Sequence, residues 1–183
     1  MKSLIPLSKP KEVLEKSAKT MHQIQPGSTS NSKPEGYSPQ QIRRAYGIDK
    51  LIKKGITGKG QNIAIIVAFG DPTVKENLKK FSKQFDLPKA KLKIYFPQGE
   101  PVKSDPFWAT ETNIDVQWAH ALAPCATIHL IVAKDDFFSS LFAAIDFANT
   151  LGVQVISMSW GAPEFQGEEL GDPFLQNPGT VYL

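Results

Sequence analysis

Two acidic residues spaced four apart are the clearest candidates for chemistry in this sequence. Glu111 and Asp115 lie in the segment Glu-Thr-Asn-Ile-Asp, and the apolar periodicity around them predicts a helix over residues 110–122. On a helix, this spacing puts both carboxylates on one face, where like charges destabilise the helix by about 0.2–0.5 kcal/mol. The pair therefore needs an explanation, and the residues allow two.

One explanation is structural and the other is catalytic. Thr110 is a candidate N-cap, which would place both acids near the first turn, where they suit the helix dipole. Two close carboxylates also push their pKa values apart, so that one can act as a general base while the other orients it. A glutamate, with a reference pKa of about 4.3, stays partly ionised at an acidic pH that protonates histidine. Spacing alone favours the structural explanation.

Apolar strands alternate with amphipathic helices on both sides of this pair. Strands are expected at 62–69, 91–96, 127–133, 153–159 and 179–183, and helices at 73–85, 110–122 and 137–151. Most of these strands are apolar throughout, as in a parallel sheet that is buried on both faces. We therefore expect an α/β fold with a doubly wound, mostly parallel sheet and helices on both faces. Since the final strand has no crossover after it, the fold is expected to be truncated there.

The first 36 residues differ from the rest of the chain. Residues 11–22 have the spacing of a short amphipathic helix, and residues 25–36 are rich in Pro, Ser, Asn and Gly. Ser38-Pro39 is a helix-start signal, with serine as N-cap and proline at the first helical position. We therefore expect a flexible N-terminal segment or linker at 1–36 and a folded domain at 37–183.

Several segments of the folded part carry a family resemblance. They are Ser38-Pro39 with Tyr46-Gly47-Ile48, residues 60–65 (Gly-Gln-Asn-Ile-Ala-Ile), Glu111 with Asp115, residues 118–121 (Trp-Ala-His-Ala) with Ala123-Pro124, and residues 156–161 (Ile-Ser-Met-Ser-Trp-Gly). Over residues 37–183 they resemble the N-terminal half of the catalytic domain of the sedolisin family, the serine-carboxyl peptidases. The resemblance implies a subtilisin-like fold and a serine-type endopeptidase that works at acidic pH.

The resemblance also implies a role for each matching residue. Glu111 would be the general base that takes the proton of the nucleophilic serine, and Asp115 would hydrogen-bond to Glu111 and hold it in place. Ser159, Trp160 and Gly161 would line the non-primed subsites, with their backbone paired to an extended peptide. The expected partner is a peptide or protein substrate.

The chain departs from the family where the remaining catalytic groups should be. Its 183 residues hold no Gly-Thr-Ser-Ala segment for the nucleophile and no Ser-Gly-Asp segment for the oxyanion-stabilising aspartate. We therefore expect no cofactor or metal site in this chain, although calcium is possible in a full-length family member. The missing C-terminal half of the catalytic domain would be a partner, and this chain alone would be inactive. The alternatives are a non-catalytic peptide-binding or regulatory remnant, or an unrelated flavodoxin-like domain with incidental carboxylates.

Composition argues against other classes of function. The net charge is only +3 and the lysines are scattered, which speaks against nucleic-acid and membrane binding. The single cysteine, Cys125, allows no internal disulfide, and no apolar run reaches the roughly 18 residues of a membrane span. Family members are usually secreted or found in acidic compartments, but the N-terminus has no visible signal peptide. The localisation therefore stays open.

Other residues with chemical potential are interpreted as structural. His120 and Asp71 lack the sequence neighbours of a subtilisin-type triad, and Asp71 is expected in a turn. His129 alternates within an apolar strand, as a core histidine would. Gly58-x-Gly60 precedes a strand, whereas a dinucleotide-binding loop follows one. Trp108 is expected in a loop before the Glu111 helix, where it would either shape a subsite or cover the core.

Overall fold

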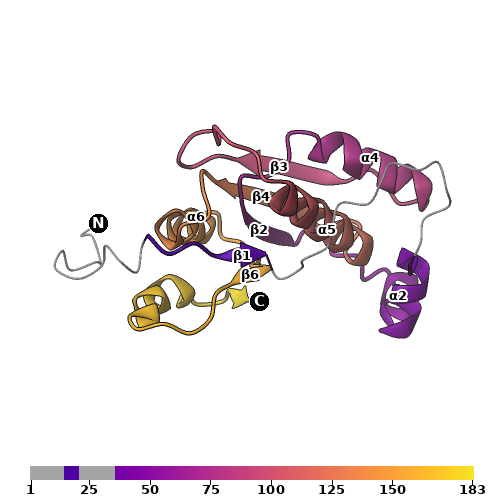
Figure 1. The fold of residues 1–183 in the computed structure, drawn as a ribbon. Coiled ribbons are helices and arrows are strands. Elements are labelled where there is room, and N and C mark those ends of the chain that lie inside the picture. The colour runs from indigo at the N-terminus through magenta and orange to yellow at the C-terminus, as the bar shows by residue number, and fades with distance from the viewer. Residues whose placement is uncertain (1–14, 21–35) are drawn as a thin grey trace.

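A five-stranded parallel sheet forms the centre of the protein. The computed structural model describes residues 15–20 and 36–183 (Figure 1). The sheet has the order β3-β4-β2-β5-β7, and every neighbouring pair is parallel. Its strands are β2 (Asn62–Ala68), β3 (Lys91–Tyr95), β4 (Thr127–Ala133), β5 (Val155–Ser157) and β7 (Val181–Tyr182). The predicted α/β class with a parallel sheet is confirmed.

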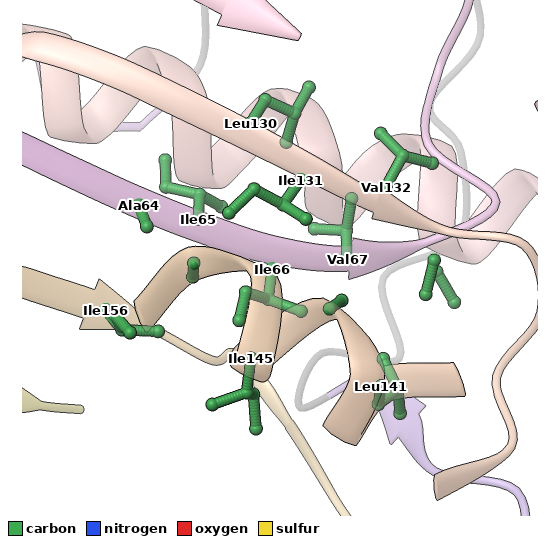
Figure 2. Close-up of a cluster of buried hydrophobic side chains, with 14 of the residues drawn as sticks. Ala64, Ile65, Ile66, Val67, Leu130, Ile131, Val132, Leu141, Ile145 and Ile156 are labelled. Carbon is green, nitrogen blue, oxygen red and sulfur yellow. The ribbon is translucent and has the colours of Figure 1, made fainter. Parts of the chain in front are cut away.

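Helices cover both faces of this sheet, as expected for a doubly wound fold. α4 (Val74–Gln84) packs on α5 (Pro106–Leu122), which lies against β2 and β4, while α6 (Phe138–Thr150) packs on the same two strands from the other side. Figure 2 shows Ile66 of β2 on the side of Leu141 and Ile145 of α6, and Val67 pointing the opposite way. Successive side chains of a strand alternate between faces, so an apolar run fills both layers of the core.

The hydrophobic core is packed around the two central strands. Residues 64–68 of β2 and 128, 130 and 131 of β4 are at most 1% exposed. Their neighbours include Leu141 and Ile145, which are also fully buried. Each such aliphatic side chain stabilises the fold by about 1.5–3 kcal/mol relative to exposure. The burial explains why these two strands stand out in the sequence as mostly apolar runs.

The strand order excludes one of the alternatives. If the five strands are numbered by their order along the chain, their order across the sheet is second, third, first, fourth and fifth. A flavodoxin-like sheet has the order second, first, third, fourth, fifth. The interpretation as an unrelated flavodoxin-like domain is therefore wrong.

The N-terminal part of the domain begins as the sequence predicts. α2 (Pro39–Ala45) starts at the N-cap Ser38, whose hydroxyl accepts from the amide of Gln41, and the Gln41 side chain accepts from the Ser38 amide. This reciprocal capping box satisfies two backbone donors at the helix start. α3 (Ile48–Lys53) follows, and Arg43 of α2 donates from Nε to the carbonyl of Ala121 in α5 at 2.7 Å.

Two expectations about local structure are wrong. The strand expected at 153–159 ends at Ser157, and the chain then forms the short strand β6 (Trp160–Gly161) outside the main sheet. A helix was expected over 11–22, but Lys19–Thr20 form strand β1, which pairs with β6 in antiparallel register (Figure 1). Residues 11–14 and 21–22 of that expected helix and residues 25–35 of the expected linker lie outside the described residues. The division at residues 36 and 37 stays a prediction.

Candidate functional site

Helix α5 carries the acidic pair, and it begins earlier than the sequence suggested. Asp105 is its N-cap, with Oδ1 accepting from the amides of Phe107 at 2.9 Å and Trp108 at 3.0 Å, and Pro106 occupies the first helical position. The expected N-cap, Thr110, lies inside the helix and donates its hydroxyl to the carbonyl of Pro106. Proline suits this first position because the amide that it lacks has no partner within the helix.

This earlier start weakens the structural explanation of the pair. The first turn of α5 contains no acidic residue, so Glu111 lies in the second turn and Asp115 in the third. The helix dipole acts mainly within the first and last turns. Stabilisation by the dipole therefore does not account for two acids at these positions.

The two carboxylates face the interior of the protein. Glu111 is only 2% exposed and Asp115 is half-buried, on a helix that packs against β2 and β4. Desolvation makes a buried carboxylate costly unless it is paired or hydrogen-bonded. An acidic residue at such a position is therefore more informative than one on a solvated helix face.

Asp115 connects the pair to the segment that follows β5. The Ser159 hydroxyl donates to Asp115 Oδ1 at 2.8 Å, across 44 residues of sequence. The next residue, Trp160, donates from its indole Nε1 to the carbonyl of Ile66 in β2 at 3.0 Å, and its ring meets that of Phe138 edge-on. These contacts fix the path of the chain into β6. They bring Asp115 together with Ser159, one of the three residues predicted to line the subsites, and hold the next of them, Trp160, against β2 and α6.

The backbone of β6 is engaged by another strand. Lys19 pairs with Gly161 and Thr20 pairs with Trp160 in antiparallel register. This is the type of backbone pairing that was predicted for these residues with an extended peptide. The sequence did not reveal that the chain's own N-terminal part would supply the paired strand.

The histidines and Asp71 have the structural roles that were predicted. His120 is fully buried with Nε2 2.9 Å from the carbonyl of Pro88, and burial, together with the charge of Arg43, lowers its pKa. His129 lies between the Tyr95 hydroxyl at 3.1 Å and Asn62 Oδ1 at 3.0 Å, and desolvation lowers its pKa as well. For both rings, burial favours the neutral form.

Asp71 caps the turn after β2. Its Oδ1 accepts from the amide and the hydroxyl of Thr73, and its Oδ2 accepts from the side-chain amides of Asn77 and Asn113. The turn itself passes through Phe69 with φ 57°. A carboxylate with so many local donors organises the start of α4, as the turn prediction implied.

Trp108 differs from its predicted place. It lies within α5 instead of a loop, is 4% exposed, and contacts Phe69 edge-on at 6.5 Å between ring centroids. Of the two roles left open for it, the core role fits this burial. Trp108 also borders a cavity of about 430 Å³, next to Asp105 and strand β1.

A larger groove lies at the carboxyl ends of the sheet strands. It has a volume of about 550 Å³, and its walls include Phe69, Asp71, Lys75, Glu100 and Lys103. Open α/β sheets usually bind ligands at this edge. Glu111 and Asp115 are not among the described residues that line this groove.

The described part of the chain also bears on metal binding and membrane crossing. Within residues 15–20 and 36–183, no cluster of three or more His, Cys, Asp or Glu side chains has the geometry to hold a metal ion. In the same part of the chain, no helix combines the length and hydrophobicity that crossing a membrane would require.

Comparison with known proteins supports the fold. No protein-family model and no curated protein matches this chain. Among solved structures, it is similar to Pseudomonas sedolisin, a serine-carboxyl proteinase that was solved in complex with two molecules of pseudo-iodotyrostatin. The identity is 19% and the TM-score is 0.51, and the match covers 66% of this chain and 34% of the proteinase. The chain thus shares part of the fold and spans about a third of the length of that protein.

Proposed function

We propose that this chain contributes the general base and the peptide-binding strand of a serine-type endopeptidase of the serine-carboxyl class. The observation that carries the proposal is the 2.8 Å hydrogen bond from Ser159 to Asp115. It joins the helix of the buried acidic pair to the strand that already pairs with an extended segment. The sedolisin-like fold supports the same assignment. In this role Glu111 is the base and Asp115 positions it, while Ser159, Trp160 and Gly161 bind substrate.

The chemistry follows from a carboxylate that replaces the histidine of a serine triad. A serine hydroxyl attacks the peptide carbonyl while Glu111 takes its proton, which then passes to the leaving amine as the C–N bond breaks. Water, deprotonated by Glu111, releases the acyl group and regenerates the serine. The 183 residues contain no Gly-Thr-Ser segment, so the serine must come from other sequence.

The test is to express the whole reading frame that encodes this chain, including any codons beyond Leu183, and to assay peptide hydrolysis at acidic pH. We expect hydrolysis that Glu111→Gln removes by several orders of magnitude, on the scale of about 10⁴–10⁶ known for members of a catalytic triad. Glu168→Gln, on an exposed residue, is the matched control and should leave the rate unchanged. Equal rates for Glu111→Gln and the control would rule out Glu111 as the base.

A second candidate function is peptide binding without catalysis. The pairing of β1 with β6 favours it, because this contact needs only backbone groups and no nucleophile. If the whole reading frame supplies no serine nucleophile and the chain binds extended peptides without cleaving them, this second function is the correct one.

A further inference from the structure

The groove of about 550 Å³ at the carboxyl ends of the strands has an apolar floor. Ile94 of β3 is the register partner of Leu130 of β4, and Val132 follows two residues later on the same face of the sheet. Figure 2 shows Leu130 and Val132 on one side of β4. All three residues line the groove, and Leu130 and Val132, which are only 1% and 2% exposed, form its deepest part.

Exposed apolar side chains continue this lining toward the solvent. Phe96 is 38% exposed and Val102 is fully exposed, and both line the groove. Apolar side chains that face water in a concave site favour a ligand with an apolar part. The volume of the groove lies within the range of about 300–1,000 Å³ that is typical of small-molecule sites, so a small molecule fits it.

The turn after β2 gives the groove a fixed wall. Phe69 has a φ of 57°, a left-handed conformation that is uncommon for a residue other than glycine. At Gly70, an added Cβ would lie 3.1 Å from Cγ1 of Val132, so the backbone of the turn comes close to the floor. Asp71 then accepts four hydrogen bonds from nearby donors. The wall is therefore preformed, and binding does not have to order it.

Positive charge predominates at the rim of the groove. Lys75, Lys103 and Glu100 line it and are exposed, and no ion pair among the described residues includes any of these three side chains. The remaining charged residue of the lining, Asp71, is already matched by its four donors. The rim thus has two positive charges against one negative charge, and a ligand with a single negative charge would balance it.

We propose that this groove binds an amphipathic monocarboxylate, a small molecule with one carboxylate on an apolar chain. The carboxylate lies at the rim with Lys75 and Lys103, and the chain lies against the floor of Ile94 and the β4 residues. Burial of the chain supplies most of the affinity, and the lysines select the charged head group. The site is separate from the acidic pair and does not depend on the proposed peptidase function.

Octanoate is the probe, and octanamide and acetate are its matched comparators. Octanamide keeps the chain without the charge, and acetate keeps the charge without the chain. In calorimetric titrations of the full chain at neutral pH, octanoate should bind at least about fivefold more tightly than octanamide and at least about tenfold more tightly than acetate. In methyl NMR spectra, octanoate should shift the signals of Ile94 and Val132, whereas Ile156 of β5, which does not line the groove, is the internal control.

Variants of the rim test the charge recognition without touching the core. Lys75→Gln and Lys103→Gln should each weaken octanoate binding about threefold, and Glu100→Gln should strengthen it about twofold. Lys79→Gln is the matched control, because Lys79 is an exposed lysine one turn along α4 from Lys75 but does not line the groove. All four positions are exposed, so the variants should fold like the unmodified chain.

Several results would overturn the proposal. Equal affinities for octanoate and octanamide, or an effect of Lys79→Gln as large as that of Lys103→Gln, would show that the rim does not recognise the carboxylate. A shift at Ile156 as large as that at Ile94 would place the ligand elsewhere, and no binding of octanoate would remove the site. Glu111→Gln should leave the affinity for octanoate unchanged, so a failure of this proposal and a failure of the proposed function are distinguishable.

Discussion

The hydrogen bond between Ser159 and Asp115 should stabilise the fold measurably. The bond links α5 to the segment after β5, so its loss would free the start of β6 from the acidic pair. Ser159→Ala removes the donor and leaves the carboxylate, and Asp115→Ala removes the acceptor, whereas an asparagine would keep an oxygen that accepts from Ser159. The double variant completes a cycle that isolates the energy of the pair from the cost of each single change.

The magnitude follows from the chemistry of the bond. A hydrogen bond to a charged group contributes about 1.5–3 kcal/mol, and the lower end applies here because both side chains are only half-buried. We expect Ser159→Ala to lower the free energy of unfolding by about 1.5 kcal/mol. For a chain of this size, that corresponds to a decrease of about 3–6 °C in Tm. The coupling energy of the cycle should lie at about 1–2 kcal/mol, within the range for contacting residues.

Urea denaturation of the four chains, followed by circular dichroism, would measure this cycle. Ser157→Ala, which removes a half-buried hydroxyl from β5, serves as the control and should change stability less than Ser159→Ala. A coupling energy within about 0.3 kcal/mol of zero, the usual error of additivity, would refute the argument that this bond holds the two parts of the site together.

Three further predictions concern the rest of the fold. Burial holds the pKa of His120 below its ordinary value, so the unfolded chain takes up a proton as pH falls below about 6.5 while the folded chain does not. Stability should therefore fall below that pH by at most about 1.4 kcal/mol per pH unit, and urea titrations from pH 7.5 to 5 should show a smaller slope for His120→Gln. Gly58→Ala should destabilise the fold more than Gly60→Ala does, as measured in thermal melts. Both positions have positive φ, which costs an alanine about 1–2 kcal/mol. Only the new Cβ at position 58 would also crowd a neighbour, Ala123 Cβ at 3.1 Å. Val181→Lys, on the half-exposed edge strand β7, should reduce self-association in light scattering, and an unchanged particle size would argue against association through this edge.

The central strands could be predicted from the sequence because their burial leaves a clear pattern. β2 was expected at 62–69 and β4 at 127–133, and the structure gives Asn62–Ala68 and Thr127–Ala133. A strand covered on both faces must be apolar throughout, so its sequence and its position are tightly linked. α5 was predicted with the right end but the wrong start. The signal for the true start of the helix was present in Asp105-Pro106, an N-cap residue followed by proline. The prediction followed the apolar periodicity, which begins after these two residues.

The pairing of β1 with β6 could not be predicted in the same way. Each strand has two residues, and they lie about 140 positions apart in the sequence. Contacts between backbone groups place few demands on side-chain type, so neither segment carries a pattern that points to the other. Residues 11–22 had helical spacing of apolar residues, and the backbone hydrogen bonds from Ala18 to Asp136 and from Phe138 to Lys16 outweighed that weak local preference in the described part of the segment.

For the candidate site, the sequence contained the acidic pair but not its surroundings. The spacing of Glu111 and Asp115 follows from helix geometry, whereas the position of Ser159 beside Asp115 depends on the sheet order that places β5 next to β2. The 2% exposure of Glu111 likewise depends on how α5 lies on the sheet. Local periodicity determines which residues share a helix face, and only the complete fold determines what that face meets.

The proposed chemistry and the composition of the core make opposite demands on pH. A glutamate base is useful where histidine is protonated, that is, at pH values well below about 6.5. His120 and His129 are both buried with lowered pKa, so the same acidity favours the unfolded chain. His129 lies between Tyr95 and Asn62, and His120 contacts the Pro88 carbonyl, so neither ring has a carboxylate among these contacts to stabilise its charged form. Acidity should therefore lower the stability of the fold through these two core histidines in the same pH range in which a glutamate base is useful.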